Sequence, residues 1–285
     1  RDPAATLTFF ADHGPVDCIV HLASLQAAGE FPARFGAIQL QDNSRIHLNV
    51  LEAWRLVQPQ AHLVAVGSSC AYPSLPGPLH ESDFESGAIH GSVYAYATTK
   101  RLLYTGVRTY SDRYRLAGSY LVPATMFGEH DDFHPDTAHV CGALIHRICK
   151  AADEEQPAVR VWGDGSQVGD LMDVTEFVRV LLAVWPELTG GTLVNVGPGR
   201  GTTIRALAEQ IRAHAGFQGA LEFDPTRYSG VPFKVLDTGK LQLELGQQVA
   251  HDLGPALLRT IAWYRTHYAA RDPRPKFPEL LETAT

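Results

Sequence analysis

The sequence has no apolar run approaching the roughly 18 residues that a transmembrane helix needs. No signal-peptide pattern opens it, so we expect a soluble, cytoplasmic protein. The formal net charge is −7 and no basic cluster occurs, which argues against nucleic acid as the main partner. No cysteine pair has Cys-x-x-Cys spacing, so we predict reduced thiols and neither a zinc site nor a disulfide framework. The cysteines are Cys18, Cys70, Cys141 and Cys149.

The chain also lacks the motif that opens a dinucleotide-binding fold. Such a fold starts with a strand, a Gly-x-Gly-x-x-Gly-type turn, and a helix whose N-terminus holds the pyrophosphate. This chain starts with Arg1-Asp2-Pro3, and its glycine-rich segments 163–166 and 197–201 lack that spacing, so we interpret them as turns. Because the first strand is usually central, its loss would leave neighbouring strands unpaired. We therefore expect the natural protein to begin upstream of Arg1.

Apolar strands alternate regularly with amphipathic helices along the chain. This alternation predicts parallel crossover units and hence a doubly wound α/β sheet of Rossmann type. The expected strands are 16–23, 62–66, 116–123, 159–162 and 192–196, and the expected helices are 4–13, 34–57, 92–114, 173–186, 203–215 and 255–268, with another beginning near His139.

The residues with the clearest chemical pattern are Tyr96 and Lys100. They are four apart in a predicted helix, so both side chains project from one face. A neighbouring ammonium ion stabilises a phenolate, and we expect the pKa of Tyr96 to fall below its usual value of about 10. Such a phenol can exchange a proton with a carbonyl or an alcohol. Ser68 lies just after the apolar strand 62–66, where an open α/β sheet places its ligand chemistry. An ordinary helix pair without a catalytic role is the alternative.

In segments 67–73 and 96–100, the chain resembles the extended short-chain dehydrogenase/reductases. It is most similar to the GDP-L-fucose synthase subgroup, because the His-Asp-Asp-Phe-His-Pro loop at 130–135 is followed by His139. The resemblance covers nearly the whole chain. It implies a dinucleotide-binding domain made of 1–124 and 174–198. It also implies a smaller nucleotide-sugar domain made of 125–173 and 199–285, and a homodimer through the helices 34–57 and 92–114.

The resemblance implies an NADPH-dependent 3,5-epimerase and 4-ketoreductase that acts on a GDP-4-keto-6-deoxyhexose and gives a GDP-L-fucose-type sugar. Ser68 and Tyr96 would hold the C4 carbonyl, and Lys100 would bind the nicotinamide ribose. Cys70 and His139 would exchange protons at C3 and C5, which suits a thiol of pKa about 8.5 and an imidazole of pKa about 6.5. The implied cofactor (NADP) contacts are Ala23, Ser68, Lys100, Pro123, Thr125, Met126 and His139, and the implied substrate contacts are Arg147, Trp162 and Lys234.

Three positions depart from the family pattern: Gly169 replaces an arginine, Ser229 an aspartate and Thr125 an asparagine. The changes at Gly169 and Ser229 favour a first alternative, a reductase or epimerase of another nucleotide-sugar, such as a dTDP-hexose. The missing glycine-rich turn favours a second, a cofactor-free binding subunit.

Several residues also have a plain structural interpretation. Cys70 would then be a buried small hydrophobic residue, Arg147 a solvated helix residue and Trp162 a core aromatic. The acidic and histidine-rich segment 130–136 lacks the spacing of a helical metal site, so we interpret it as a structural loop and predict no metal.

Overall fold

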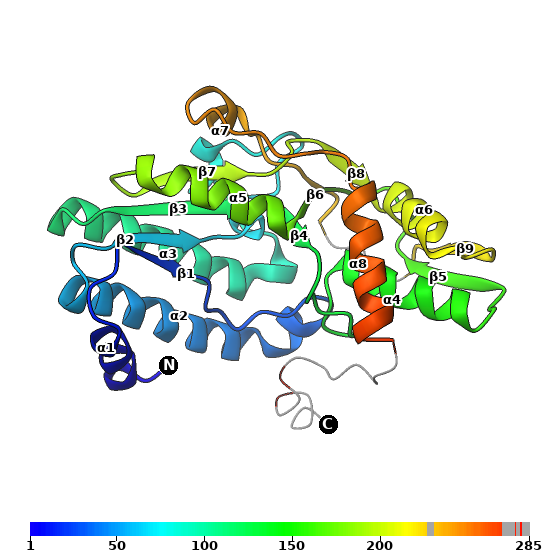
Figure 1. The fold of residues 1–285 in the computed structure, drawn as a ribbon, viewed down its shortest axis with the longest axis horizontal. Helices are drawn as coiled ribbons and strands as arrows, with labels where there is room; N and C mark the ends of the chain where they lie inside the picture. The colour runs from blue at the N-terminus through cyan, green and yellow to red at the C-terminus, as the bar shows by residue number, and fades with distance from the viewer. Residues whose placement is uncertain (227–230, 270–276, 278–279, 281–285) are drawn as a thin grey trace.

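The computed structural model describes residues 1–226, 231–269, 277 and 280 (Figure 1). Its main sheet has four parallel strands in the order β1-β2-β3-β7. Every residue of β2 and β3 is buried, as expected for strands that are covered on both faces. The fold class is therefore the predicted one. The strands are β1 (Cys18–His21), β2 (His62–Val66), β3 (Gly118–Pro123) and β7 (Thr192–Val196).

Helices cover both faces of this sheet (Figure 1). The long helices α2 (Phe31–Val57) and α3 (Tyr94–Tyr114) pack against each other on one face, and α5 (Val174–Val184) lies on the other. Helix α1 (Pro3–Asp12) packs against α2. Helix α2 begins earlier than predicted because a proline, whose fixed φ suits a first helical turn, stands near its start.

A smaller assembly of short strands and three helices adjoins the carboxyl edge of the main sheet (Figure 1). Most of its strands were not predicted from the sequence. They are two to six residues long and carry Gly, Asp and Thr, so they lack an apolar run or a clear alternation. The strands are β4 (Thr125–Phe127), β5 (Ala158–Trp162), β6 (Val168–Asp173), β8 (Gly201–Thr203), β9 (Ala220–Asp224) and β10 (Phe233–Lys234); the helices are α4 (Val140–Asp153), α6 (Ile204–Ala215) and α8 (Gly254–His267).

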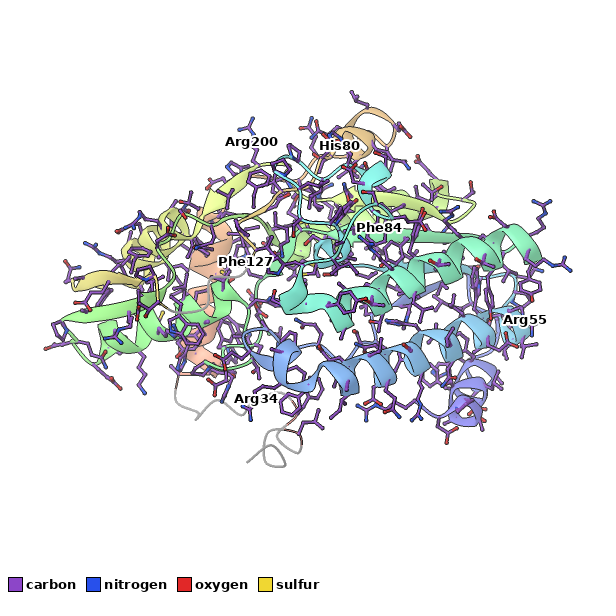
Figure 2. The ribbon with its side chains drawn as sticks, turned by 180° about the vertical axis from the view of Figure 1, so that it is seen from behind. Arg34, Arg55, His80, Phe84, Phe127 and Arg200 are labelled. Carbon is purple, nitrogen blue, oxygen red and sulfur yellow. The ribbon has the colours of Figure 1, made fainter. Side chains whose placement is uncertain are left out.

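Two large hydrophobic clusters form the core of the described chain. Phe84 belongs to the cluster around the main sheet, and Phe127 belongs to the cluster between α4, α6 and α8; both are labelled in Figure 2. The predicted domain bounds do not fully separate the two clusters, because Met172, predicted in the second domain, belongs to the first cluster. Leu236 and Leu241, near the short helix α7 (Gly239–Leu243), pack into the first cluster although the prediction assigned them to the second domain. The domain boundaries themselves stay a prediction.

Strand β1 lies at an edge of the main sheet. Among the described residues its strand partner is β2, and Val20 and Leu22 are 39% and 61% exposed.

Two expectations from composition can be compared with the structure. The cysteines are free thiols, as predicted. Within the described ranges, no helix combines the length and the hydropathy needed to cross a membrane.

Candidate active site

The candidate active site starts at the carboxyl end of β2. A Cβ atom at Gly67 would lie 2.4 Å from the Tyr120 ring, so only glycine fits where the chain leaves the strand. Ser68 then caps a short 3-10 turn, and its Oγ accepts a hydrogen bond of 3.2 Å from the Cys70 amide. This turn fixes Ser68 and Cys70 at the edge of the sheet, which is where we expected ligand chemistry.

The structure brings Tyr96 together with Ser68. Side-chain hydrogen bonds join Tyr96 to Ser68 and to Ser24, and the positive charge of Lys100 lies 5.7 Å from the centre of the tyrosine ring. Tyr96 and Lys100 point from the same face of α3, as their spacing predicted.

The predicted fall in the pKa of Tyr96 is wrong. Burial raises that pKa, the nearby Cys70 raises it further, and the hydrogen bonds from Ser68 and Ser24 lower it only in part. The reason is that the protein interior solvates a phenolate poorly, and here this cost outweighs the stabilising neighbours. Tyr96 is therefore a neutral phenol at neutral pH, which is the form that can donate a proton.

Lys100 is buried, with 3% of its surface exposed, and its Nζ donates a 2.9 Å hydrogen bond to the carbonyl oxygen of Val66. Burial lowers its pKa to about 8. The buried pair His21 and His47 lies close by, with Nε2 of His21 2.9 Å from Nδ1 of His47. Burial, and then the charge of Lys100, lowers the pKa of His21 to about 3 and that of His47 to about 2, so both rings stay neutral.

This arrangement fits the nicotinamide end of a dinucleotide. Among the described residues, the carbonyl oxygen of Val66 is the acceptor of the hydrogen bond from the Lys100 ammonium group. The ammonium group has further N–H groups that can donate to ribose hydroxyls. The described residues contain no strand–glycine turn–helix unit that could hold the pyrophosphate. They therefore fit only the nicotinamide end of the cofactor. Ala23 lies two residues after the end of β1, Pro123 is the last residue of β3, and Thr125 and Met126 begin β4.

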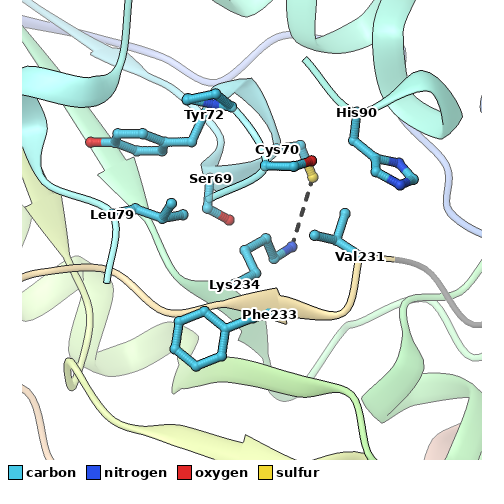
Figure 3. Close-up of a pocket in the computed structure, with 10 residues that line it drawn as sticks. Ser69, Cys70, Tyr72, Leu79, His90, Val231, Phe233 and Lys234 are labelled. Atoms are coloured by element: carbon cyan, nitrogen blue, oxygen red, sulfur yellow. Dashed lines mark hydrogen bonds between the residues drawn. The ribbon is translucent and has the colours of Figure 1, made fainter. Parts of the chain in front are cut away.

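Cys70 faces Lys234 across a small pocket (Figure 3). Nζ of Lys234 lies 3.7 Å from Sγ of Cys70, and Cys70 is partly exposed, unlike the buried Cys141 and Cys149. Lys234 reaches this position because β10 pairs in parallel with β6, with Lys234 beside Gly169. The contact joins the turn after β2 to β10. The contact was not predicted, because the two residues are 164 positions apart.

His139 is the N-cap residue of α4. Its Nε2 lies 2.8 Å from Nε2 of Gln26, in the loop that follows β1. Ser24, which bonds to Tyr96, belongs to the same loop. Sequence reasoning missed both Ser24 and Gln26. They directly follow an apolar strand at the edge of the sheet, and this is the signal that singled out Ser68.

The predicted substrate contacts Arg147 and Trp162 also meet. The guanidinium of Arg147 lies 4.5 Å from the centre of the Trp162 ring, a cation–π contact, and burial lowers the pKa of Arg147. Both side chains are partly buried, so Arg147 is not a freely solvated helix residue. Ser229, one of the three positions that depart from the family pattern, lies outside the described residues.

Segment 130–136 packs as a structural loop. Phe133 is fully buried and contacts Tyr264 and Tyr268, and the backbone oxygen of Asp132 packs against Gly142 of α4. In the part of the chain that the structure describes, no group of three or more His, Cys, Asp or Glu side chains is arranged to hold a metal ion.

Asp170 is a further buried carboxyl group near this site. Burial raises its pKa to about 7, against hydrogen bonds from the backbone of Leu236 and Gly199 and the charge of Lys234, which lower it. Its Oδ1 atom has no hydrogen-bond partner among the described residues.

Asp170 should make the protein less stable as the pH rises. Because its pKa is higher in the folded chain than in the unfolded one, its stabilising contribution is complete below about pH 4 and is lost as the pH rises through about 7. The variant Asp170→Asn should therefore unfold at a higher temperature than wild type at pH 8, by the equivalent of about 4 kcal/mol at most. At pH 5 the difference should shrink. Calorimetry at both pH values measures it. The exposed Asp164→Asn is the control, and an equal gain at both pH values would contradict the account.

A parallel sheet that holds Ser68, Tyr96 and Lys100 at its carboxyl edge defines a short-chain dehydrogenase/reductase site. The chain belongs to the NAD dependent epimerase/dehydratase family, whose model matches residues 1–197.

Individual relatives agree with this assignment. A probable GDP-L-fucose synthase 1 of Oryza sativa subsp. japonica is 32% identical, over 90% of this chain and 78% of the rice protein. The GDP-L-fucose synthase of Escherichia coli (strain K12) is 30% identical, over 86% of this chain and 79% of its own length. A crystal structure of a GDP-L-fucose synthetase from Naegleria fowleri bound to NADP is 22% identical. It has a TM-score of 0.84 and covers 94% of this chain and 83% of that one.

Proposed function

We propose that the protein is an NADPH-dependent 3,5-epimerase and 4-ketoreductase of a GDP-4-keto-6-deoxyhexose and produces a GDP-L-fucose-type sugar. The observation that carries the proposal is that Ser68, Tyr96 and Lys100 lie together. Cys70 lies on the short turn that Ser68 caps. The rice and Escherichia coli relatives named as GDP-L-fucose synthases support the substrate class. The NADP-bound Naegleria fowleri structure supports the choice of NADP.

The reductive half of the reaction uses Tyr96 as the proton donor. NADPH supplies a hydride to sugar C4 when it is bound. Tyr96 stays protonated because burial raises its pKa, so it can give a proton to the C4 oxygen as charge develops there. Ser68 hydrogen-bonds to Tyr96 and holds the carbonyl oxygen next to it. The cation of Lys100, buried beside the tyrosine ring, stabilises the phenolate that is left.

The epimerising half uses Cys70 and His139 on the carbons beside the ketone. A hydrogen next to a carbonyl is acidic, because the carbanion is delocalised onto the oxygen that Ser68 and Tyr96 hold. One group removes that proton and the other protonates the opposite face. Lys234 supports Cys70 as the base, because its positive charge lies 3.7 Å from Sγ.

Arg147 and Trp162 form the contact surface that we propose for the nucleotide diphosphate. Arg147 brings a cation to the phosphate oxygens, and Trp162 keeps the guanidinium plane oriented. Gly169 of β6 lies beside Lys234 of β10. A Cβ atom at Gly169 would have no described atom within 4 Å. A side chain therefore has room at this position.

Restoring the family's arginine should strengthen substrate binding. In Gly169→Arg a second cation enters the open space beside Lys234, and a charge-assisted hydrogen bond to a phosphate oxygen is worth about 1.5–3 kcal/mol. The substrate Kd, measured by calorimetry, should fall about tenfold or more. The control Gly169→Gln has a long neutral side chain and should give little change. An unchanged Kd for the arginine variant would contradict the proposed diphosphate position.

We propose a homodimer that is formed through α2 and α3. Three leucines of α2 are exposed: Leu40, Leu48 and Leu56, at 44%, 48% and 52%. Large apolar side chains that are exposed on one helix support an interface there. We also propose that the protein is cytoplasmic.

The assay that tests the proposed function follows NADPH absorbance with purified full-length protein. GDP-4-keto-6-deoxymannose should be reduced with one NADPH consumed per sugar, and dTDP-4-keto-6-deoxyglucose should react far more slowly. Preference for the dTDP-sugar would favour the other-sugar alternative. No NADPH consumption with either sugar would favour a cofactor-free binding subunit.

A further inference from the structure

The loop after β1 is fastened at two places on either side of Gln26. The amide of Leu25 donates a 2.6 Å hydrogen bond to Oδ1 of the buried Asn43, whose Nδ2 donates back to the Leu25 carbonyl oxygen at 3.1 Å. Beyond Gln26, the amide of Ala28 donates a 2.9 Å hydrogen bond to the carbonyl oxygen of Thr137, two residues before His139. The Gln26 backbone therefore has a fixed position relative to the start of α4.

From this fixed backbone the side chain of Gln26 reaches the His139 ring. Nε2 of Gln26 lies 2.8 Å from Nε2 of His139, which is a normal hydrogen-bond length. An amide nitrogen is a donor only, so the ring nitrogen must be the acceptor, and the neutral ring then carries its proton on Nδ1.

A side-chain amide can serve both protonation states of a histidine. Its N–H donates to the bare nitrogen of the neutral ring, and after a half-turn of the amide its carbonyl oxygen accepts from the N–H of the charged ring. A carboxylate would favour the charged ring alone, and a lysine the neutral ring alone. A group that must gain and lose a proton in each turnover benefits from a neighbour that tolerates both forms.

We propose that Gln26 is a positioning residue that holds the His139 ring in one orientation through its gain and loss of a proton. The inference rests on the proposed function for the role of His139 in epimerisation. The contact itself does not depend on that role. Gln26 does not touch the reacting atoms and acts through His139.

A first experiment reads the ring directly and needs no substrate. Long-range ¹H–¹⁵N spectra of ¹⁵N-histidine-labelled protein show which ring nitrogen carries the proton, and His139→Asn identifies the His139 signals. At a pH where the ring is neutral, the proton should be on Nδ1 in wild type. In Gln26→Met, which keeps the length but loses the amide, a second tautomer should become populated. A wild-type ring protonated on Nε2, or identical spectra in the two proteins, would overturn the proposal.

A second experiment follows deuterium entry at sugar C3 and C5 in heavy water. Gln26→Met should slow it about tenfold to a hundredfold, the usual result of a misplaced catalytic group, while NADPH oxidation changes little. In Gln26→Glu the carboxylate should stabilise the charged ring and shift the pH profile of exchange upward. The exposed Gln218→Met is the control. Wild-type rates and profile in both Gln26 variants would overturn the proposal. If wild type exchanges no deuterium, the proposed function fails, and the spectra still decide the role of Gln26.

Discussion

The variant Tyr96→Phe should reduce the 4-keto sugar about 10²–10⁴-fold more slowly than wild type, the usual contribution of a general acid. Phenylalanine keeps the ring that packs beside Lys100 and removes only the hydroxyl that bonds to Ser68 and Ser24. Since burial raises the pKa of that hydroxyl, it is protonated at neutral pH and can give its proton to the C4 oxygen. Single-turnover NADPH oxidation measures the loss.

Two comparisons make the Tyr96 result specific. Tyr94→Phe changes the same atom on the same helix, but Tyr94 is 62% exposed, so its rate should equal that of wild type. NADPH affinity should be nearly the same in both variants, because the hydroxyl acts on the sugar oxygen. Normal turnover by Tyr96→Phe would show that Tyr96 is not the acid.

The variant Cys70→Ser should lose epimerisation and keep reduction. Serine retains the size and the hydrogen bond from its backbone to Ser68, but an alkoxide forms far less readily than a thiolate, so carbanion formation should slow about 10²–10⁴-fold. Hydride transfer depends on Ser68, Tyr96 and Lys100 and should continue on the unepimerised ketone. Deuterium entry from heavy water, read by mass spectrometry beside NADPH oxidation, separates the two steps.

Cys18→Ser is the matched control for Cys70. Cys18 is also partly buried and free, but it lies on β1, and burial raises the pKa of its thiol. This variant should epimerise and reduce like wild type. Equal deuterium entry in Cys70→Ser and wild type would exclude Cys70 as the base.

The sequence predicted the part of the fold that repeats a simple pattern. Strand β2 and helix α3 were identifiable because an uninterrupted apolar run and the Tyr96/Lys100 spacing are local properties. Strands β6 and β10 were not identifiable from the sequence. The two-residue strand β10 (Phe233–Lys234) exists only because it pairs with β6, which is distant in the chain. The assembly of short strands beside the main sheet is therefore a result of the structure.

The same distinction applies to the site. Motif residues such as Ser68 and Cys70 could be named from the chain, whereas the contacts of Gln26 with His139 and of Lys234 with Cys70 join residues more than a hundred positions apart. The pKa of Tyr96 could not be predicted either, because spacing along a helix gives its charged neighbour but not the depth of burial.

The central claim, that one site both epimerises and reduces, is tested most directly by a single reaction in heavy water. Full-length protein, NADPH and GDP-4-keto-6-deoxymannose are incubated together, and the product is examined by NMR. We expect a GDP-L-fucose-type sugar that carries deuterium at C3 and C5, with one NADPH consumed per product molecule. A reduced sugar that contains no deuterium and retains the configuration of the substrate would contradict the dual activity and leave a simple 4-ketoreductase.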